Sequence, residues 1–239
     1  MTTGRMQFLS QSMNRLADFS FILADKAMPE KGPAKNLYLL HGLTGTDTDW
    51  LWGGGNAHQI AKEFHLNIFM PTCGNTFYLD LPGNGNAYGS YIGKEFVRYT
   101  QQIFHLSSAR EDNLIGGFSM GGYGALHAAL SYPDSFSRAA VLSAASPREA
   151  LSYLKPSGVS SVADPTAEAE CLLRRGVALP KLYMACGTED SLLPASREYQ
   201  TFFSAHMDDF LYEEGPGMHD WSFWNLYVLR GLRWLLGGL

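Results

Sequence analysis

The sequence of 239 residues predicts an α/β fold built on one mostly parallel β-sheet with helices on both faces. Short apolar runs alternate with longer segments that repeat apolar residues at helical spacing, a pattern typical of strands covered by helices. Apolar residues make up 46% of the chain and charged residues only 17%, enough apolar material for one large core. We therefore expect a single domain over residues 1–239.

The apolar runs place the individual elements. Two stretches near the amino terminus, 5–12 and 15–24, predict a pair of antiparallel strands at one edge of the sheet. Six further strands are expected at 36–41, 66–71, 113–118, 139–143, 181–186 and 209–214. Helices are expected between them at 56–64, 90–104, 121–131, 194–205 and 221–236.

One long segment, 146–179, interrupts this alternation. Its middle is rich in serine, glycine and proline, and helical pieces flank it on both sides. Excursions of that length inside an α/β domain usually form lids or binding loops. The segment therefore predicts a small lid-like insertion and not a second domain.

Charge and cysteine content exclude several classes of protein. The net charge of −5 and the absence of any run of like charges argue against nucleic-acid binding. Cys73, Cys171 and Cys186 form no CxxC pair, so we expect free thiols in a reducing, cytoplasmic compartment. The amino terminus has no apolar core typical of a signal peptide, and no run of 18 apolar residues predicts a membrane span.

The stretch IGGFSMGGYGAL places Ser119 among five glycines, after a predicted strand and before a predicted helix. Its G-x-S-x-G pattern in this context is typical of a nucleophilic serine on a sharp, strained turn. Side chains at Gly117 and Gly121 would collide in such a turn, and Gly122 and Gly124 would let the helix lie close to the sheet. The alternative is a glycine-rich turn in which Ser119 only caps the helix.

An activated serine needs an imidazole base and a carboxylate that orients the imidazole. In a parallel sheet these groups come from loops at the carboxyl ends of later strands, in the order serine, acid, histidine. His219 follows the last predicted strand and a GPG turn, and Asp190 follows the strand at 181–186. We prefer Asp190 to the adjacent Glu189 because the shorter acid is the commoner orienter. An ordinary loop histidine and a solvated or helix-capping acid are the alternatives.

Two backbone N–H groups should face the oxyanion that forms during attack on a carbonyl. One is expected from Met120, directly after the serine, and the other from Leu43 in the HGLTG loop. His41 ends the strand before this loop, and Trp221 follows His219 by two residues. We expect His41 and Trp221 to contribute to substrate binding.

The segments HGLTGTDTDW, GFSMGGYGAL, CGTEDSLL and GMHDWSFWN resemble the esterase D-like family of α/β-hydrolases in order and spacing, over about residues 5–237. That family includes tributyrin, acetyl, feruloyl and acetylxylan esterases, S-formylglutathione hydrolases and mycolyltransferases. The resemblance implies an α/β-hydrolase fold in which Ser119, Asp190 and His219 form a catalytic triad. It also implies the two amides above as the oxyanion hole, and no cofactor or metal.

Two departures from the family bear on the substrate. S-formylglutathione hydrolases usually carry a cysteine in place of Gly45, and tributyrin-type esterases usually carry an acid in place of Asn225. The resemblance implies a serine carboxylesterase for short-chain, acetyl-type esters, with sugar or feruloyl esters as candidate substrates. A thioesterase like S-formylglutathione hydrolase, an acyltransferase and a non-catalytic binding protein are the alternatives. The expected partner is a small-molecule ester. The sequence leaves the oligomeric state open between a monomer and a homo-oligomer.

Overall fold

The structure is a computed structural model that describes residues 1–25 and 32–237. Across these residues one eight-stranded sheet has the order β1-β2-β4-β3-β5-β6-β7-β8. Strands β3 to β8 are parallel to one another, whereas β1 pairs antiparallel with β2 and β2 pairs antiparallel with β4. The predicted parallel sheet with an antiparallel amino-terminal edge is therefore confirmed.

The elements lie close to their predicted positions. The strands are β1 (Thr2–Ser10), β2 (Arg15–Leu23), β3 (Lys35–Leu40), β4 (Leu66–Pro71), β5 (Asn113–Phe118), β6 (Arg138–Leu142), β7 (Lys181–Gly187) and β8 (Phe210–Gly215). The helices are α1 (Ala57–Phe64), α2 (Tyr88–Ser90), α3 (Phe96–Phe104), α4 (Met120–Ser131), α5 (Pro147–Leu154), α6 (Pro165–Arg174), α7 (Leu193–His206) and α8 (Trp221–Leu235). One π-helical turn (Tyr91–Glu95) joins α2 to α3, and short 3-10 turns lie at Arg110–Asp112 and Lys155–Ser157.

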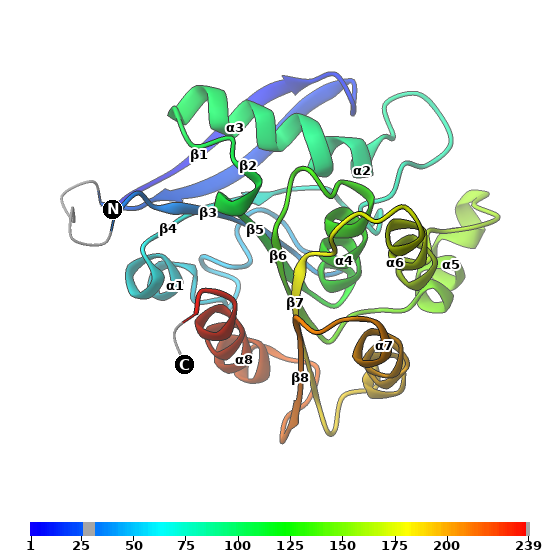
Figure 1. Cartoon of the computed structure of the whole chain (residues 1–239). Helices are drawn as coiled ribbons and strands as arrows, with labels where there is room; N and C mark the ends of the chain where they lie inside the picture. Colours follow the sequence, from blue (N-terminus) through cyan, green and yellow to red (C-terminus); the bar gives the residue numbers. More distant parts are fainter. Residues whose placement is uncertain (26–31, 238–239) are drawn as a thin grey trace.

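Side chains of the central strands alternate between two apolar cores. In β3, Leu37 and Leu39 belong to the core that includes α1 and α8, whereas Tyr38 and Leu40 belong to the core that includes α3, α4, α6 and α7. Figure 1 shows α1 and α8 on one side of the sheet and α4, α6 and α7 on the other. Burial on both faces explains why the parallel strands read as unbroken apolar runs in the sequence. Because β5 to β8 run parallel, the carboxyl ends of β5, β7 and β8 lie on one edge of the sheet.

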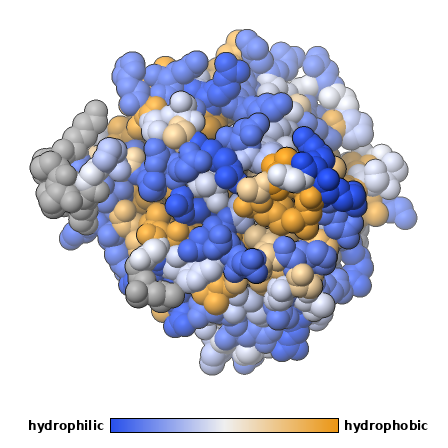
Figure 2. Space-filling model, in the orientation of Figure 1, coloured by the Kyte–Doolittle hydropathy of each residue, from blue (hydrophilic) through white to orange (hydrophobic). Residues whose placement is uncertain are grey.

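The surface seen in Figure 2 is mostly hydrophilic, and apolar residues gather in separate patches. The carboxy-terminal helix α8 carries Arg230, paired with Glu213, and Arg233, paired with Glu63. Among the residues that the structure describes, no helix has the length and apolar character needed to cross a membrane.

The predicted insertion at 146–179 lies between β6 and β7 and contains α5 and α6. Its second half is attached to the rest of the domain through α4. The Tyr123 hydroxyl donates to the carbonyl of Ala163 (2.6 Å), and the imidazole of His127 lies 2.8 Å from the carboxylate of Glu168. Its first half, α5 with the turn that follows, borders the cavity described below.

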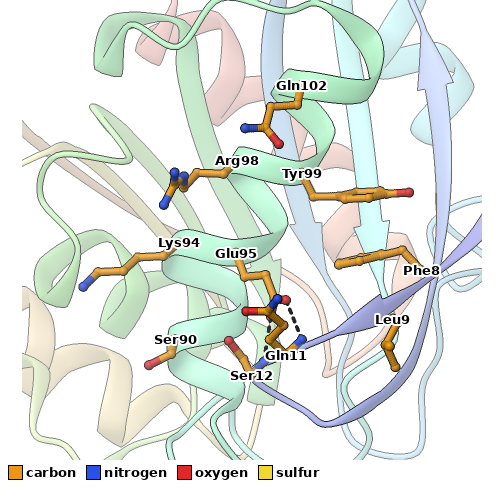
Figure 3. Close-up of a pocket in the computed structure, with 10 residues that line it drawn as sticks. All are labelled: Phe8, Leu9, Gln11, Ser12, Ser90, Lys94, Glu95, Arg98, Tyr99 and Gln102. Atoms are coloured by element: carbon orange, nitrogen blue, oxygen red, sulfur yellow. Dashed lines mark hydrogen bonds between the residues drawn. The ribbon is translucent and has the colours of Figure 1, made fainter.

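One carboxylate fastens the β1–β2 hairpin to the helical stretch at 88–104 (Figure 3). Glu95 accepts hydrogen bonds from the Ser10 hydroxyl (2.7 Å) and from the amides of Gln11 (2.6 Å) and Ser12 (3.0 Å). Because these groups turn toward Glu95, β1 ends at Ser10, whereas the sequence predicted a strand up to residue 12. Burial raises the pKa of the Glu95 carboxyl, but the hydrogen bonds outweigh it and hold the pKa below its ordinary value.

We predict that Glu95→Ala lowers the free energy of unfolding by about 2–4 kcal/mol, because three donors lose a charged acceptor. Urea unfolding followed by fluorescence measures the change as a lower midpoint at constant slope. Gln102→Ala, an exposed change further along the same helix, is the control and should shift stability by less than about 0.5 kcal/mol. Equal midpoints for the two variants would contradict the role given to Glu95.

Candidate active site

Ser119 stands on the turn between β5 and α4, with φ 58° and ψ −122°. This conformation is strained for any residue other than glycine. Three backbone hydrogen bonds hold it in place. The Ser119 amide donates to the carbonyl of Leu142 (2.9 Å), and its own carbonyl accepts from the amides of Tyr123 (3.1 Å) and Ala145 (3.2 Å). The hydroxyl is thereby presented at the carboxyl end of β5.

Glycines are required at this turn because backbone lies against backbone. A Cβ at Gly117 would lie 2.4 Å from the carbonyl oxygen of Gly121, and one at Gly121 would lie 2.5 Å from that of Leu40. These contacts confirm the predicted reason for both glycines. The prediction was wrong for Gly124, where a Cβ would meet the ring of Tyr78 at 2.2 Å and not the sheet.

The imidazole of His219 connects Ser119 to Asp190. Its Nε2 lies 2.9 Å from the Ser119 Oγ, and its Nδ1 lies 2.8 and 3.1 Å from the two carboxylate oxygens of Asp190. Because a carboxylate only accepts, Nδ1 carries the proton and Nε2 is left to accept from the serine hydroxyl. The three side chains come from the loops after β5, β7 and β8, whose ends share one edge of the sheet.

The Asp190 carboxylate is fully buried, and its Oδ1 accepts from the amide of Leu192 (2.8 Å). Burial raises the pKa of this carboxyl, but hydrogen bonds from His219, Leu192 and Ser143 outweigh it and lower the pKa overall. Ser143 also accepts from the indole N–H of Trp224 (3.1 Å), whose ring lies edge-on to His219 at 4.9 Å between centroids. Ser143 and Trp224 thus hold the acid and the imidazole in place, and the sequence prediction missed both.

The neighbouring acid, Glu189, points away from the imidazole. Its carboxylate accepts from the amide of Gly217 (2.6 Å) and from the hydroxyl of Thr188 (2.7 Å). Of the two candidate acids, the structure therefore brings only Asp190 to His219.

A cavity of about 710 Å³ opens beside Ser119, and Leu43 and Met120 both line it. Within residues 1–25 and 32–237, the amides of Leu43 and Met120 donate no hydrogen bond to the protein. The Met120 amide is the first of helix α4, where the helix dipole favours negative charge. Of the other lining residues, Phe77 comes from the loop after β4 and Leu192 from the loop after β7. The rest lie in or beside α5: Ala145, Arg148, Glu149, Ser152, Tyr153 and Pro156.

His41 does not reach this cavity. It is 1% exposed, its Nε2 accepts from the amide of Cys73 (3.1 Å), and its Nδ1 donates to the carbonyl of Gly42 (2.7 Å). Both ring nitrogens are used inside the protein, so neither is left for a ligand. This placement corrects the expectation that His41 binds the substrate, and instead His41 braces the loop that carries Leu43.

Trp221 also lies outside the cavity lining. Its ring packs against Trp50, with 5.1 Å between centroids, and against Phe118 at 4.6 Å. A Cβ at Gly54 would lie 2.4 Å from the Trp221 ring, so the loop at 51–55 packs closely over it. Unlike His41, Trp221 is only half-buried, so the substrate contact expected there stays a prediction.

A buried aspartate ties the Leu43 loop to the antiparallel edge of the sheet. The Asp47 carboxylate accepts from the guanidinium of Arg5 (2.8 Å) and from the hydroxyls of Ser20 (2.7 Å) and Thr72 (2.8 Å). Burial raises the pKa of Asp47, but these hydrogen bonds outweigh it and hold the pKa below its ordinary value. Asp47 was missed by the sequence prediction, because its partners lie far away in the chain.

The arrangement suits acyl transfer. It brings together a hydroxyl, an imidazole beside it, a buried acid that orients the imidazole, and two free amides at the same cavity. In the part of the chain that the structure describes, no group of three or more histidine, cysteine or acidic side chains is placed to hold a metal ion.

We predict that Asp47→Asn lowers the free energy of unfolding by about 2–4 kcal/mol at neutral pH. The folded-state pKa of Asp47 is depressed, so its stabilisation is complete above about pH 5 and is lost as the pH falls through the folded pKa. The wild-type protein should therefore lose more stability than Asp47→Asn between about pH 6 and about pH 3.

Urea titrations across that pH range measure the difference. Asp134→Asn is the matched control, because Asp134 is exposed and makes no hydrogen bond or ion pair within the described ranges. Parallel pH dependences for the wild type and Asp47→Asn would contradict the stabilising role of the Asp47 carboxylate.

Comparison with known proteins shows the family. Residues 10–235 match the Esterase family. An acetyl esterase of Caldicellulosiruptor saccharolyticus is 34% identical over 221 residues, which cover 84% of this chain and 83% of that protein.

Two solved structures from Staphylococcus aureus are similar over 98% of this chain and 98% of their own. A substrate-bound fluorophosphonate-binding serine hydrolase has a TM-score of 0.87 at 28% identity. An S-formylglutathione hydrolase without ligand has a TM-score of 0.85, also at 28% identity. The chain therefore belongs to the Esterase family, has the α/β-hydrolase fold and is a serine carboxylesterase.

Proposed function

We propose that this carboxylesterase hydrolyses small-molecule esters of short, acetyl-type acyl groups through an acyl-enzyme on Ser119. One observation carries the proposal: the imidazole of His219 lies 2.9 Å from the Ser119 hydroxyl and 2.8 Å from the buried carboxylate of Asp190. The acetyl preference is supported by the acetyl esterase that shares 34% of its residues with this chain.

In the acylation step, the Ser119 oxygen attacks the ester carbonyl while Nε2 of His219 takes the hydroxyl proton. The carbonyl oxygen becomes an oxyanion, which accepts hydrogen bonds from the free amides of Leu43 and Met120. Asp190 stays ionised and stabilises the imidazolium through the hydrogen bond to Nδ1. The tetrahedral intermediate then collapses, and His219 returns the proton to the leaving alcohol.

Water completes the cycle. It loses a proton to Nε2 of His219 as it attacks the acyl-enzyme, and the second tetrahedral intermediate uses the same two amides. Collapse releases the carboxylic acid and returns the proton to Ser119. An acceptor alcohol in place of water would give acyl transfer, so product analysis with an added alcohol tests the acyltransferase alternative.

We predict that Ser119→Ala removes the burst of p-nitrophenol from p-nitrophenyl acetate and lowers kcat/KM by about 10⁴-fold or more, because no nucleophile is left. In the wild type the burst should equal the concentration of enzyme. Ser108→Ala, an exposed serine outside the site, should keep both the burst and the rate. A full burst in Ser119→Ala would reject this serine as the nucleophile.

We further propose that the cavity holds the alcohol half of the ester, because about 710 Å³ is far more room than an acetyl group needs. The aromatic rings of Phe77 and Tyr153 at its wall favour an apolar or aromatic alcohol.

For p-nitrophenyl esters, kcat/KM should therefore fall by about tenfold or more from acetyl to octanoyl, because the proposed placement gives the cavity to the alcohol half and not to the acyl chain. A series of acetyl, butyryl, octanoyl and feruloyl esters measures this order. Higher kcat/KM for the octanoyl or feruloyl ester would overturn the short-acyl proposal.

The second candidate is a thioesterase acting on S-formylglutathione. Similarity to the S-formylglutathione hydrolase structure favours it. Against it, a Cβ at Gly45 would lie 2.2 Å from a carboxylate oxygen of Asp49, so a cysteine at this position would displace Asp49. Comparing kcat/KM for S-formylglutathione and an aryl acetate separates the two.

The prediction of a cytoplasmic location continues to rest on the cysteines. Cys73, Cys171 and Cys186 are free thiols in the structure, which is the state expected in a reducing compartment.

A further inference from the structure

We propose that Asn75 is a positioning residue for the oxyanion hole, and that it couples the Leu43 amide to helix α5 at the wall of the cavity. The inference rests on the proposed function, because it concerns an amide that would bind the oxyanion. Asn75 lies in the loop after β4, outside every motif of the sequence.

Asn75 uses both ends of its side-chain amide. Its Oδ1 accepts from the backbone amide of Thr44 at 2.7 Å, and its Nδ2 donates to the hydroxyl of Tyr153 at 2.8 Å. The N–H of Thr44 can only donate, which fixes the oxygen of Asn75 on that side. One side chain thus links the residue after Leu43 to a residue of α5.

The bond to Thr44 acts on a strained piece of backbone. Thr44 has a φ of 64°, a conformation that is strained for a residue other than glycine. The Thr44 hydroxyl donates to the carbonyl of Leu43 (2.6 Å), and the amide of Gly45 donates to the carbonyl of Gly42 (3.2 Å). The Leu43 amide therefore sits in a tight turn whose orientation depends on these few hydrogen bonds.

The two proposed oxyanion donors differ in what holds them. Met120 is fully buried and begins helix α4, so the helix fixes its amide. Leu43 is 37% exposed, so packing alone does not fix its loop. His41 and Asp47 hold other parts of this loop, and Asn75 adds the side-chain restraint on the amide directly after Leu43.

The link to α5 passes along the cavity wall. Tyr153 lines the cavity beside Ser119, is 44% exposed, and lies 5.8 Å from the ring of Phe77. A substrate in the cavity therefore touches the residue that holds Nδ2 of Asn75. A shift of α5 would therefore move the Thr44 amide through the side chain of Asn75.

Asn75→Leu, which keeps the shape but removes both hydrogen bonds, should lower kcat for p-nitrophenyl acetate by about 10- to 100-fold with KM changed less than about twofold. Binding of an aryl trifluoromethyl ketone, which forms a tetrahedral oxyanion with the serine, should weaken by a similar factor. Tyr153→Phe, which removes only the link to α5, should lower kcat by about 3- to 10-fold. Asn84→Leu, at an exposed asparagine outside the site, should leave both measurements unchanged.

Wild-type kcat and ketone affinity in Asn75→Leu would overturn the inference, and so would a rise in KM alone. If Asn75→Leu does not fold, as judged by circular dichroism, Tyr153→Phe decides by the same two measurements. The Ser119→Ala variant distinguishes failure of the role given to Asn75 from failure of the proposed function. An inactive Ser119→Ala beside an unaffected Asn75→Leu rejects only the role of Asn75, whereas an active Ser119→Ala rejects the serine mechanism itself.

Discussion

At the turn between β5 and α4, the chain passes so close to its own backbone and to β3 that Gly117 and Gly121 have no room for a side chain. This close approach holds Ser119 in its strained conformation and directs its hydroxyl to the edge where β7 and β8 also end. The positions of Asp190 and His219 matter only because the turn brings the hydroxyl to them. The amide of Met120 is available for the same reason, since the turn starts a helix directly after the serine.

Buried or partly buried carboxylates hold loops at three places in the fold. Asp190 binds the amide of Leu192 as well as His219, Asp47 ties the Leu43 loop to the sheet edge, and Glu95 collects the amides of the β1–β2 hairpin. In each case hydrogen bonds lower the pKa of an acid that burial alone would raise. A charged acceptor satisfies several donors at once, so one acid can fix a loop that has little apolar packing of its own.

The parallel strands could be predicted because burial on both faces leaves continuous apolar runs, and the serine turn because glycines are needed where backbones touch. Sequence order alone then indicated Asp190 and His219 at the ends of later strands. The roles of Ser143, Asp47 and Asn75 could not be predicted, because their partners are remote in the chain and no local pattern marks them. His41 was misplaced for another reason: nearness in sequence to a site does not tell which way a side chain points.

The strain at Ser119 also means that activity is gained at a cost in folding stability. Its φ of 58° suits glycine better than serine, while the hydrogen bonds to Leu142, Tyr123 and Ala145 are made by backbone atoms that glycine also has. A glycine at this position would keep these three backbone hydrogen bonds and lose the penalty of carrying a Cβ, at the cost of the hydroxyl's hydrogen bond to His219. Selection for folding stability alone would therefore favour glycine at this position, although glycine has no hydroxyl to act as the nucleophile.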